Sequence, residues 1–528
     1  MHVVARTIAL ALASLAASCA SIPGANYPRE PSTALDSPEV TALGREVSGD
    51  EQLRGGVSKF RLLTDGNDGF VARAEMADAA QRTLDIQYFL FQDDETGKLL
   101  VDSLLHGAAR GVRVRLLIDD TEDVTKNPQI AALAAHENIE VRVFNPFNLH
   151  GPLAALRYAE FFLTATRVNY RMHNKLFIAD NSLAVVGGRN VGDEYFETSR
   201  ATGFADFDVL AAGPVVQQLS SSFDAYWNSE VVIPLEGLAS GHASTSALKR
   251  DSADRAATRE TADGTRLAER IATRNPLDEF LRGGEGTIYA HADVLYDAPE
   301  KREVEEGAKD GPLMRHHLVA AIDEVRSELL IASPYVVPGE GGMRLIEKVR
   351  SRGARVMIVT NSLAATEMPI AHAGYEHYRK RMLEDGVGLC EMRPTPGDQA
   401  ERDGASSDSP APSRAALHGK AFVLDRQRVF IGSMNFDRRS LRVNTEMGLL
   451  IDSRELAQQV ALHIEALSRP ANCYTPVLSP PDAFGHRSLS WQTEENGKVI
   501  NLASEPTGNL LRGLKASLLS LLPLDDLL

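Results

Sequence analysis

The length, composition and charge of the chain exclude several classes of protein. At 528 residues it is too long for one ordinary hydrophobic core, which predicts about two to four structural units. The 43% of hydrophobic and 24% of charged residues are typical of a globular protein and exclude a largely disordered one. The formal net charge of −16, from 56 basic and 72 acidic residues, argues against a protein that holds nucleic acid by its overall charge. An anionic substrate therefore requires a local basic cluster.

The first 22 residues resemble a segment that directs export. Arg6 precedes an apolar run, 7–17, that is too short to cross a bilayer but fits the hydrophobic region of a signal peptide. The run leads into Leu15-Ala16-Ala17-Ser18-Cys19, which resembles a bacterial lipoprotein box, although such boxes usually carry leucine where this chain has Ala16. We expect lipidation at Cys19, or else an ordinary signal or an uncleaved anchor. Either way, this N-terminus predicts a membrane-associated protein of the bacterial cell envelope.

The rest of the chain alternates between strand-like and helix-like segments, which predicts an α/β protein from about Phe60 onward. The units expected in chain order are 1–22, a signal or lipoprotein-like segment; 23–57, a tether; 58–236, a first lobe; 237–285, a linker or insertion; 286–470, a second lobe; and 471–528, a C-terminal tail. A loop is expected at 396–413, with a lid as the alternative. An amphipathic helix is expected at 509–528, docked on the body or lying in a membrane interface.

Similar elements recur in the two lobes at a nearly constant displacement. A strand at 83–91, a helix at 99–110 and a strand at 112–118 are followed later by a strand at 329–335, a helix at 343–351 and a strand at 352–359. Tyr88 and Tyr335 lie 247 residues apart, Gly111 and Gly353 lie 242 apart, and His173 and His418 lie 245 apart. This regularity predicts a duplicated lobe.

Each lobe carries one copy of the same polar motif. The first copy is His173, Lys175, Asp180, Gly187 and Asn190, and the second is His418, Lys420, Asp425, Gly432 and Asn435. The offsets from the histidine are identical in the two copies, and each motif is expected to form two strands joined by a turn at the aspartate. A chance hairpin would not repeat the same polar residues at the same places.

One active site with two histidines would explain the duplication. If the lobes meet about a pseudo-twofold axis, Lys175 and Lys420 neutralise the oxygens of a phosphodiester and Asn190 and Asn435 add hydrogen bonds. The imidazoles of His173 and His418 then supply a nucleophile and a proton donor.

Carboxylates are expected to orient the two imidazoles. Glu446 lies 28 residues after the histidine of its own lobe, and Asp206 lies 33 residues after the other, each at the start of an apolar strand. Asp208 is the alternative to Asp206. Asp180 and Asp425 follow a strand at its turn and are interpreted as structural residues.

The motifs favour chemistry without a metal ion or other cofactor. A lysine beside each histidine would repel a cation, and neither motif contains a cluster of histidine, cysteine and carboxylate ligands. Two further cysteines, Cys390 and Cys473, leave open one disulfide or two unrelated thiols.

The paired motifs resemble those of the phospholipase D superfamily, over residues 58–470. Within it the chain is most similar to bacterial cardiolipin synthases of the C type. The segments that carry this finer resemblance are 84–89, 110–120, 187–196 and 444–448. The resemblance implies two duplicated α/β/α lobes related by a pseudo-twofold axis, with one active site at their interface.

The resemblance also implies an activity. Such enzymes transfer a phosphatidyl group between phospholipids at a membrane surface through a phosphohistidine, with His173 as the expected nucleophile and His418 as acid and base. Cardiolipin synthesis from phosphatidylglycerol and a second phospholipid is the leading hypothesis. The alternatives are hydrolysis of phospholipids to phosphatidic acid and, less favoured because of the acidic charge, nuclease activity; no nucleic-acid partner is expected. Arg189, where the second motif has Met434, is expected to contact phosphate or to lie at the surface.

Overall fold

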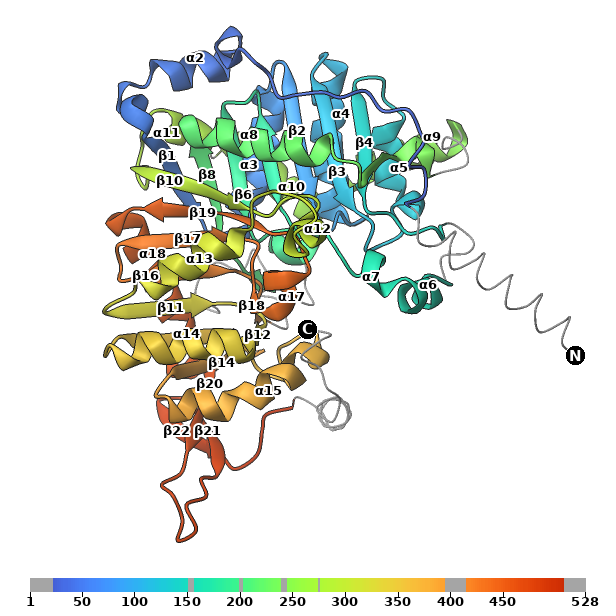
Figure 1. Ribbon diagram of the computed structural model, residues 1–528. Coiled ribbons are helices and arrows are strands. Elements are labelled where there is room, and N and C mark those ends of the chain that lie inside the picture. Colours follow the sequence, from blue (N-terminus) through green and yellow to red (C-terminus); the bar gives the residue numbers. More distant parts are fainter. Residues whose placement is uncertain are drawn as a thin grey trace, which may run out of the picture.

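The computed structural model describes residues 22–150, 156–198, 203–238, 245–273, 276–394 and 415–507. Cys19 and the segments 396–413 and 509–528, for which we made predictions above, lie outside these ranges. Within them, two α/β lobes share one continuous sheet of 18 strands (Figure 1). None of the helices in these ranges combines the length and the hydrophobicity that crossing a bilayer requires.

The first lobe contains the first motif. Its elements, with the N-terminal segment, are η1 (Pro38–Val40), α2 (Ala42–Gly49), η2 (Glu51–Gly56), β1 (Ser58–Leu63), α3 (Gly66–Ala79), β2 (Thr83–Tyr88), α4 (Glu95–Ala109), β3 (Arg113–Asp119), η3 (Val124–Lys126), α5 (Pro128–Ala134), β4 (Ile139–Phe144), α6 (Arg157–Leu163), α7 (Ala165–Val168), β5 (Leu176–Ala179), β6 (Leu183–Gly187), η5 (Asp193–Tyr195), β7 (Gly203–Ala205), β8 (Asp208–Ala212), α8 (Pro214–Trp227), β9 (Val232–Pro234) and η6 (Leu235–Gly237). Strands β2, β3 and β4 run parallel, and β5, β6, β8 and β1 continue the sheet in antiparallel pairs. The two strands predicted after His173 are confirmed as β5 and β6.

The second lobe repeats this order. Its elements are β10 (Ile288–Tyr296), α12 (Lys301–Glu305), α13 (Met314–Asp323), β11 (Glu328–Ala332), β12 (Val336–Val337), α14 (Gly339–Ser351), β13 (Arg355–Asn361), α15 (Pro369–Glu384), β14 (Gly388–Met392), β15 (Ala415–Leu417), β16 (Ala421–Leu424), β17 (Arg428–Gly432), β18 (Phe436–Asp437), α17 (Arg438–Arg442), β19 (Met447–Asp452), α18 (Arg454–Leu467) and η7 (Pro470–Asn472), followed by β20 (Cys473–Leu478), β21 (Leu489–Glu495) and β22 (Lys498–Leu502). Strands β11, β13 and β14 are parallel, and β16, β17, β19 and β10 follow in antiparallel pairs.

The two lobes are joined through equivalent strands. Strand β1 pairs antiparallel with β10, its counterpart in the second lobe, with Ser58 opposite Ala290 and Phe60 opposite Ile288. Two equivalent strands that pair in opposite directions are related by a local twofold axis. The predicted duplication about a pseudo-twofold axis is therefore confirmed.

The buried side chains form three layers, and the middle layer belongs to both lobes. Helices α3, α4 and α5 cover the outer face of the first part of the sheet, and α13, α14 and α15 cover the outer face of the second. The middle layer contains α8 and α18 with the inner faces of both parts. Successive residues of β5 alternate between layers, Phe177 to the outer and Ile178 to the middle one. Separating the lobes would expose the middle layer to water, so the boundary between them is a firmly packed place for a site.

Two segments interpreted from their composition as a tether and a linker pack on the first lobe. In the first segment, Arg115 and Arg142 of the sheet donate hydrogen bonds to the carbonyl oxygens of Ser32 and Glu30. In the second, α9 (Thr245–Arg259), α10 (Ala262–Thr273) and α11 (Pro276–Leu281) lie against α3, α4 and α5. The segment 23–57 is therefore not a simple tether, because two arginines of the sheet hold its backbone carbonyls. Composition does not reveal such contacts.

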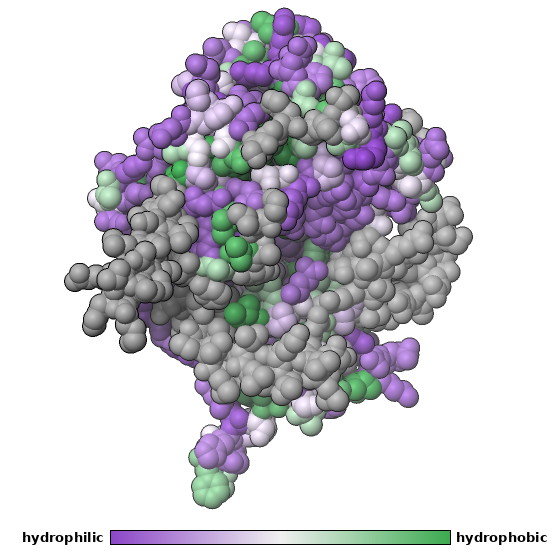
Figure 2. Space-filling model, turned by 90° about the vertical axis from the view of Figure 1, so that its right-hand side faces the viewer, coloured by the Kyte–Doolittle hydropathy of each residue, from purple (hydrophilic) through white to green (hydrophobic). Residues whose placement is uncertain are grey.

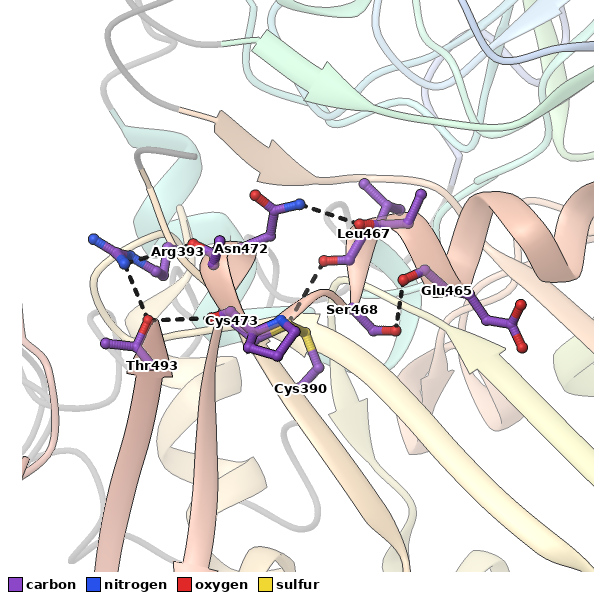
Figure 3. The surroundings of a disulfide bond; sticks show 11 residues. Cys390, Arg393, Glu465, Leu467, Ser468, Asn472, Cys473 and Thr493 are labelled. Carbon is purple, nitrogen blue, oxygen red and sulfur yellow. Dashed lines mark hydrogen bonds between the residues drawn. A yellow bond between two sulfur atoms is a disulfide. The ribbon is translucent and has the colours of Figure 1, made fainter. Parts of the chain in front are cut away.

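A disulfide joins Cys390 of β14 to Cys473 of β20, with the two Cα atoms 5.4 Å apart (Figure 3). Close by, Arg393 donates to the Thr493 hydroxyl at 3.0 Å, which ties β21 to the same end of β14 (Figure 3). The question that the sequence left open is thus answered in favour of one bridge. It fastens the C-terminal hairpin, which extends the sheet at the edge of the second lobe (Figure 1).

Candidate active site

The histidine of the first motif is anchored by the second lobe. The backbone N–H of His173 donates to the Thr445 carbonyl at 2.9 Å, and the Thr445 N–H donates to the Arg171 carbonyl at 2.9 Å. This short parallel bridge brings Glu446 beside the imidazole, whose Nδ1 lies 2.9 Å from Glu446 Oε2. The ring of His173 is therefore oriented from across the lobe boundary.

The histidine of the second motif is anchored by the first lobe in the same way. Strand β15 pairs parallel with β7, with Leu417 opposite Ala205, and the His418 N–H donates to the Ala205 carbonyl at 2.9 Å. Asp206 follows directly, and its Oδ2 lies 2.6 Å from Nδ1 of His418. Each lobe thus supplies one histidine and the carboxylate that holds the other histidine.

The sequence named the two carboxylates but did not assign each to a histidine. The pairing of β7 with β15 and of Met172 with Thr445 makes the arrangement a crossed one. The choice of Asp206 over Asp208 agrees with the geometry, because Asp208 forms a buried ion pair with Arg73 at 2.8 Å.

The protonation of the site follows from its burial. Burial, together with the neighbouring lysine charges, lowers the pKa of His173 to about 4 and that of His418 to about 3, although the carboxylate beside each ring acts in the opposite direction. Burial alone would raise the pKa of Asp206 and Glu446, but the histidine that each contacts lowers it below the ordinary value. Near neutral pH the imidazoles are therefore neutral and the carboxylates ionised. An ionised carboxylate only accepts hydrogen bonds, so Nδ1 carries the proton and Nε2 keeps a lone pair.

The two motif lysines are buried close to the histidines. Lys420 Nζ lies 3.0 and 3.1 Å from the two ring nitrogens of His418, and Lys175 donates to the carbonyl of His173. Burial lowers the pKa of Lys420 to about 8. It lowers the pKa of Lys175 well below the ordinary value, with the charge of Lys420 as a second cause. Two ammonium groups held this close make the site ready to receive an anion.

The two motif asparagines differ in their contacts. Asn190 is already engaged, since its Nδ2 donates to the Tyr195 hydroxyl at 3.0 Å and its Oδ1 accepts from the Leu90 N–H. Asn435 is also buried, but its Oδ1 has no hydrogen-bond partner among the described residues. An unpaired buried amide is free to bind a substrate, whereas an engaged one would have to exchange its partner.

Asp180 and Asp425 lie at the turns after β5 and β16, in the left-handed backbone region with φ of 50° and 53°. The carboxylate of Asp180 accepts backbone hydrogen bonds from residues 81, 82 and 83, and that of Asp425 accepts them from residues 326, 327 and 328. Both therefore tie the motif turn to the start of the neighbouring strand, β2 or β11, which pairs antiparallel with the motif strand. These contacts support the structural interpretation.

The departures between the two motifs have steric and electrostatic reasons. A Cβ at Gly188 would lie 2.1 Å from Asp206 Oδ1, so no side chain fits there. At the matching place the Ser433 hydroxyl donates to the longer Glu446. Arg189 is wholly buried and donates to the carbonyls of residues 63 and 64, so both expectations for it, phosphate contact and surface position, are wrong.

Aromatic rings that the sequence did not single out form walls around the histidines. The Phe89 ring lies edge-on to His173 at 5.0 Å between centroids, and Tyr195 and Phe204 lie 5.0 and 5.2 Å from His418. Phe89 also lines a pocket of 250 Å³ with Asp119 and the loop that follows β3. Phe89 therefore lies between this pocket and the first histidine.

Two groups outside the motifs have the residue types of metal ligands. They are Asp120, Asp123 and His150, and His372, Glu376 and Glu505. Each already holds an arginine: Arg157 contacts Asp120 at 3.1 Å, and Arg379 contacts Glu505 at 2.5 Å. In each group a guanidinium already neutralises a carboxylate that a metal cation would need as a ligand. In the motif site each histidine lies beside a lysine and not beside further metal ligands.

Two α/β lobes whose histidine and lysine motifs meet in one site define a phospholipase D-like enzyme. The family model for “Cardiolipin synthase, PLD-like domain” matches residues 74–227 and 318–468, one match in each lobe. The chain belongs to this family of phospholipase D-like cardiolipin synthases.

Relatives and a solved structure agree with this assignment. The chain is 35% identical to cardiolipin synthase C of Escherichia coli K12, over 87% of this chain and 94% of the relative. It is 24% identical to cardiolipin synthase B of the same organism, over 76% and 78% of the two chains. The crystal structure of phosphatidylserine synthase from Haemophilus influenzae covers 80% of this chain and 91% of its own, with a TM-score of 0.52 and 14% identity, which shows a common fold.

Proposed function

We propose that this protein is a phosphatidyltransferase that makes cardiolipin from phosphatidylglycerol and a second phospholipid. The observation that carries the proposal is the crossed pairing of His173 with Glu446 and of His418 with Asp206, beside two buried lysines. This arrangement offers two oriented imidazoles and a strong positive potential at one point, which is what exchange at a phosphodiester requires. The names of the relatives support phospholipids as the substrates.

In the first step, Nε2 of His173 attacks the phosphorus and the bond to the leaving glycerol oxygen breaks. That oxygen takes a proton from His418, and a phosphatidyl-histidine remains. His418 is neutral in the empty site because burial and lysine charge hold its pKa at about 3. A bound phosphodiester brings a negative charge that opposes Lys175 and Lys420, which raises the pKa of His418 and allows it to hold a proton.

In the second step, His418 accepts the proton of an incoming hydroxyl, whose oxygen attacks the phosphorus while the bond to His173 breaks. A phosphatidylglycerol hydroxyl gives cardiolipin, and water gives phosphatidic acid. The assignment of His173 as nucleophile is supported by its Nε2, which forms no hydrogen bond with the described residues, whereas Lys420 lies beside both ring nitrogens of His418. Asn435 and Asn190 are proposed to bind the substrate phosphate through their amide N–H groups, and the unpaired Oδ1 of Asn435 can accept a hydrogen bond from a hydroxyl next to that phosphate.

The protein is proposed to work at a membrane of the bacterial cell envelope, attached by its N-terminal signal or by lipid on Cys19. The disulfide between Cys390 and Cys473 supports this placement, because such bonds persist in oxidising compartments.

The lipid products test the proposed function. Purified wild type and the His173→Ala variant are incubated with labelled phosphatidylglycerol, alone and with phosphatidylethanolamine, and the products are separated. We expect labelled cardiolipin from the wild type and none from the variant. Phosphatidic acid as the only product of the wild type would reject synthesis in favour of hydrolysis.

Trapping the covalent intermediate tests the order of the two histidines. With a labelled donor that carries a nitrophenol leaving group, which departs without a proton from His418, and with rapid quenching in denaturant at alkaline pH, where a phosphohistidine survives, the His418→Ala variant is expected to accumulate labelled protein, because the intermediate forms but is not resolved. The His173→Ala variant should carry no label. Label on His173→Ala alone would reverse the two roles.

A further inference from the structure

A groove of 520 Å³ is lined by residues of α13 and α14 on the second lobe, outside the candidate active site. Figure 1 shows these two helices on the second lobe. Four basic side chains line it, with apolar ones between them: Arg315, His316, Arg344, Lys348, Val319 and Leu345. A basic groove stands out in a chain whose net charge is −16. Positive charge gathered at one place in an acidic protein favours the binding of an anion there.

The positive charge of the groove is only partly compensated. Lys348 pairs with Asp323 at 2.8 Å, but Asp323 also pairs with Arg352 at 3.1 Å, so one carboxylate serves two cations. Arg344 is exposed and forms no ion pair with any residue that the structure describes. A free guanidinium beside a shared carboxylate leaves an excess of positive charge that an anion can neutralise.

The floor of the groove is apolar. Val319 is 39% exposed on α13, and the partly buried Leu345 lies on α14. On the side of the molecule that carries α6 and α7, the described apolar residues form only small patches among hydrophilic ones (Figure 2). Apolar burial alone would give weak attachment through such patches, so charge has to contribute to any binding of a membrane.

Side-chain contacts connect the helices of the groove with α17, which lies beside the second motif. Gly339, at the start of α14, lies so close to Arg438 that a Cβ there would be 2.8 Å from its side chain. Glu305 contacts both Arg315 of the groove and, at 3.8 Å, Arg442. Arg438 and Arg442 bound α17, which begins three residues after Asn435.

We propose that the groove between α13 and α14 docks anionic phospholipid headgroups of the membrane that supplies the substrate. The guanidinium of Arg344 and the ammonium of Lys348 bind headgroup phosphates, and Val319 meets the apolar part of the lipid. Docking at this place holds the second lobe at the bilayer with its active-site edge close to the lipids. The proposal rests on the proposed function for its choice of lipid, but binding requires no turnover.

Vesicle binding tests the groove. The full chain with Cys19→Ser, which prevents acylation, is mixed with phosphatidylcholine vesicles that contain or lack phosphatidylglycerol, and the bound fraction is measured by flotation. We compare the double variant Arg344→Glu, Lys348→Glu with a control of equal charge change, Arg282→Glu, Lys380→Glu. The control residues are exposed cations that do not line the groove, Arg282 just after α11 and Lys380 in α15, each in an ion pair as Lys348 is.

The groove variant is expected to lose the phosphatidylglycerol-dependent part of binding on the order of tenfold, since each basic residue near a bilayer contributes to affinity. The control is expected to keep most of it, and both variants should retain wild-type activity on a dispersed short-chain phospholipid. Equal losses in the two variants, or binding that is insensitive to phosphatidylglycerol, would overturn the proposal. If the wild type makes no cardiolipin but the groove variant still loses vesicle binding, the proposed function is rejected and the docking proposal stands.

Discussion

The two lobes have the same strand order but hold the histidine of the other lobe with different carboxylates. In the first lobe the short Asp206 reaches His418 across the boundary, and its carboxylate occupies the space where a side chain at position 188 would lie. In the second lobe the longer Glu446 reaches His173 and is held by the Ser433 hydroxyl. The duplication has therefore kept the geometry of the imidazoles, while carboxylate length and the neighbouring residue changed together.

The largest expected effect comes from neutralising the two carboxylates. Glu446→Gln and Asp206→Asn each remove the acceptor that fixes the imidazole tautomer, so we expect either to lower the rate of transfer by on the order of 10⁴-fold. The measurement is the rate of cardiolipin formation under saturating phosphatidylglycerol. A loss below about tenfold in both variants would contradict the role of the crossed pairs.

A donor with a nitrophenol leaving group separates the two carboxylates. Nitrophenolate needs no proton to depart, so Asp206→Asn, which acts through His418, should still release a burst of nitrophenol equal to the amount of enzyme. Glu446→Gln, which acts through His173, should show no burst. A burst from Glu446→Gln alone would assign the nucleophile to the second lobe.

A smaller effect is expected at the residues beside the carboxylates, and it differs between the lobes. In Gly188→Ser the new side chain collides with Asp206, so stability should fall by about 1 to 3 kcal/mol and activity by nearly as much as in Asp206→Asn. Ser433→Gly removes one hydrogen bond to Glu446 and should be far milder. Thermal unfolding and transfer rates of both variants check this; equal effects would contradict the steric explanation.

The sequence predicted the parts of the site better than their pairing. Identical offsets identified both histidines, both lysines and the turn aspartates, because a repeated motif keeps its local geometry. The exchange of Asp206 and Glu446 between lobes depends on β7 pairing with β15. No periodicity within a strand reveals which distant strand lies beside it, so this pairing required the structure.

The N-terminal segment and Arg189 show a second limit of sequence reasoning. Residues 30 and 32 offer backbone carbonyls to Arg142 and Arg115, to which Ser32 adds its hydroxyl, and Arg189 likewise binds the carbonyls of residues 63 and 64. Every residue type carries a backbone carbonyl, so composition cannot show where a buried arginine finds one. Basic residues near a motif are therefore easily mistaken for substrate ligands.

The pH dependence of catalysis distinguishes the two lysines. For kcat/KM we expect an acid limb near pH 4, where His173 becomes protonated, and an alkaline limb near pH 8, where Lys420 loses its charge. The charge of Lys420 lowers the pKa of Lys175. In Lys420→Met the alkaline limb of the residual activity should therefore move to higher pH. In Lys175→Met the alkaline limb should stay near pH 8, as in the wild type. An acid limb near 6.5 would indicate an exposed histidine instead.

The smallest effect on activity is expected from the one covalent difference between the lobes. The disulfide closes a loop that contains His418, Lys420 and Glu446, with its cysteines 83 residues apart in sequence, yet it lies at the far edge of the second lobe's part of the sheet. Replacing both Cys390 and Cys473 with alanine should lower the free energy of unfolding by about 2 to 4 kcal/mol and leave transfer at moderate temperature nearly unchanged. Because α8 and α18 share one buried layer, calorimetry should still show a single transition. Two separate transitions would mean that the shared layer does not couple the unfolding of the two lobes, and that each lobe stabilises its half of the site independently.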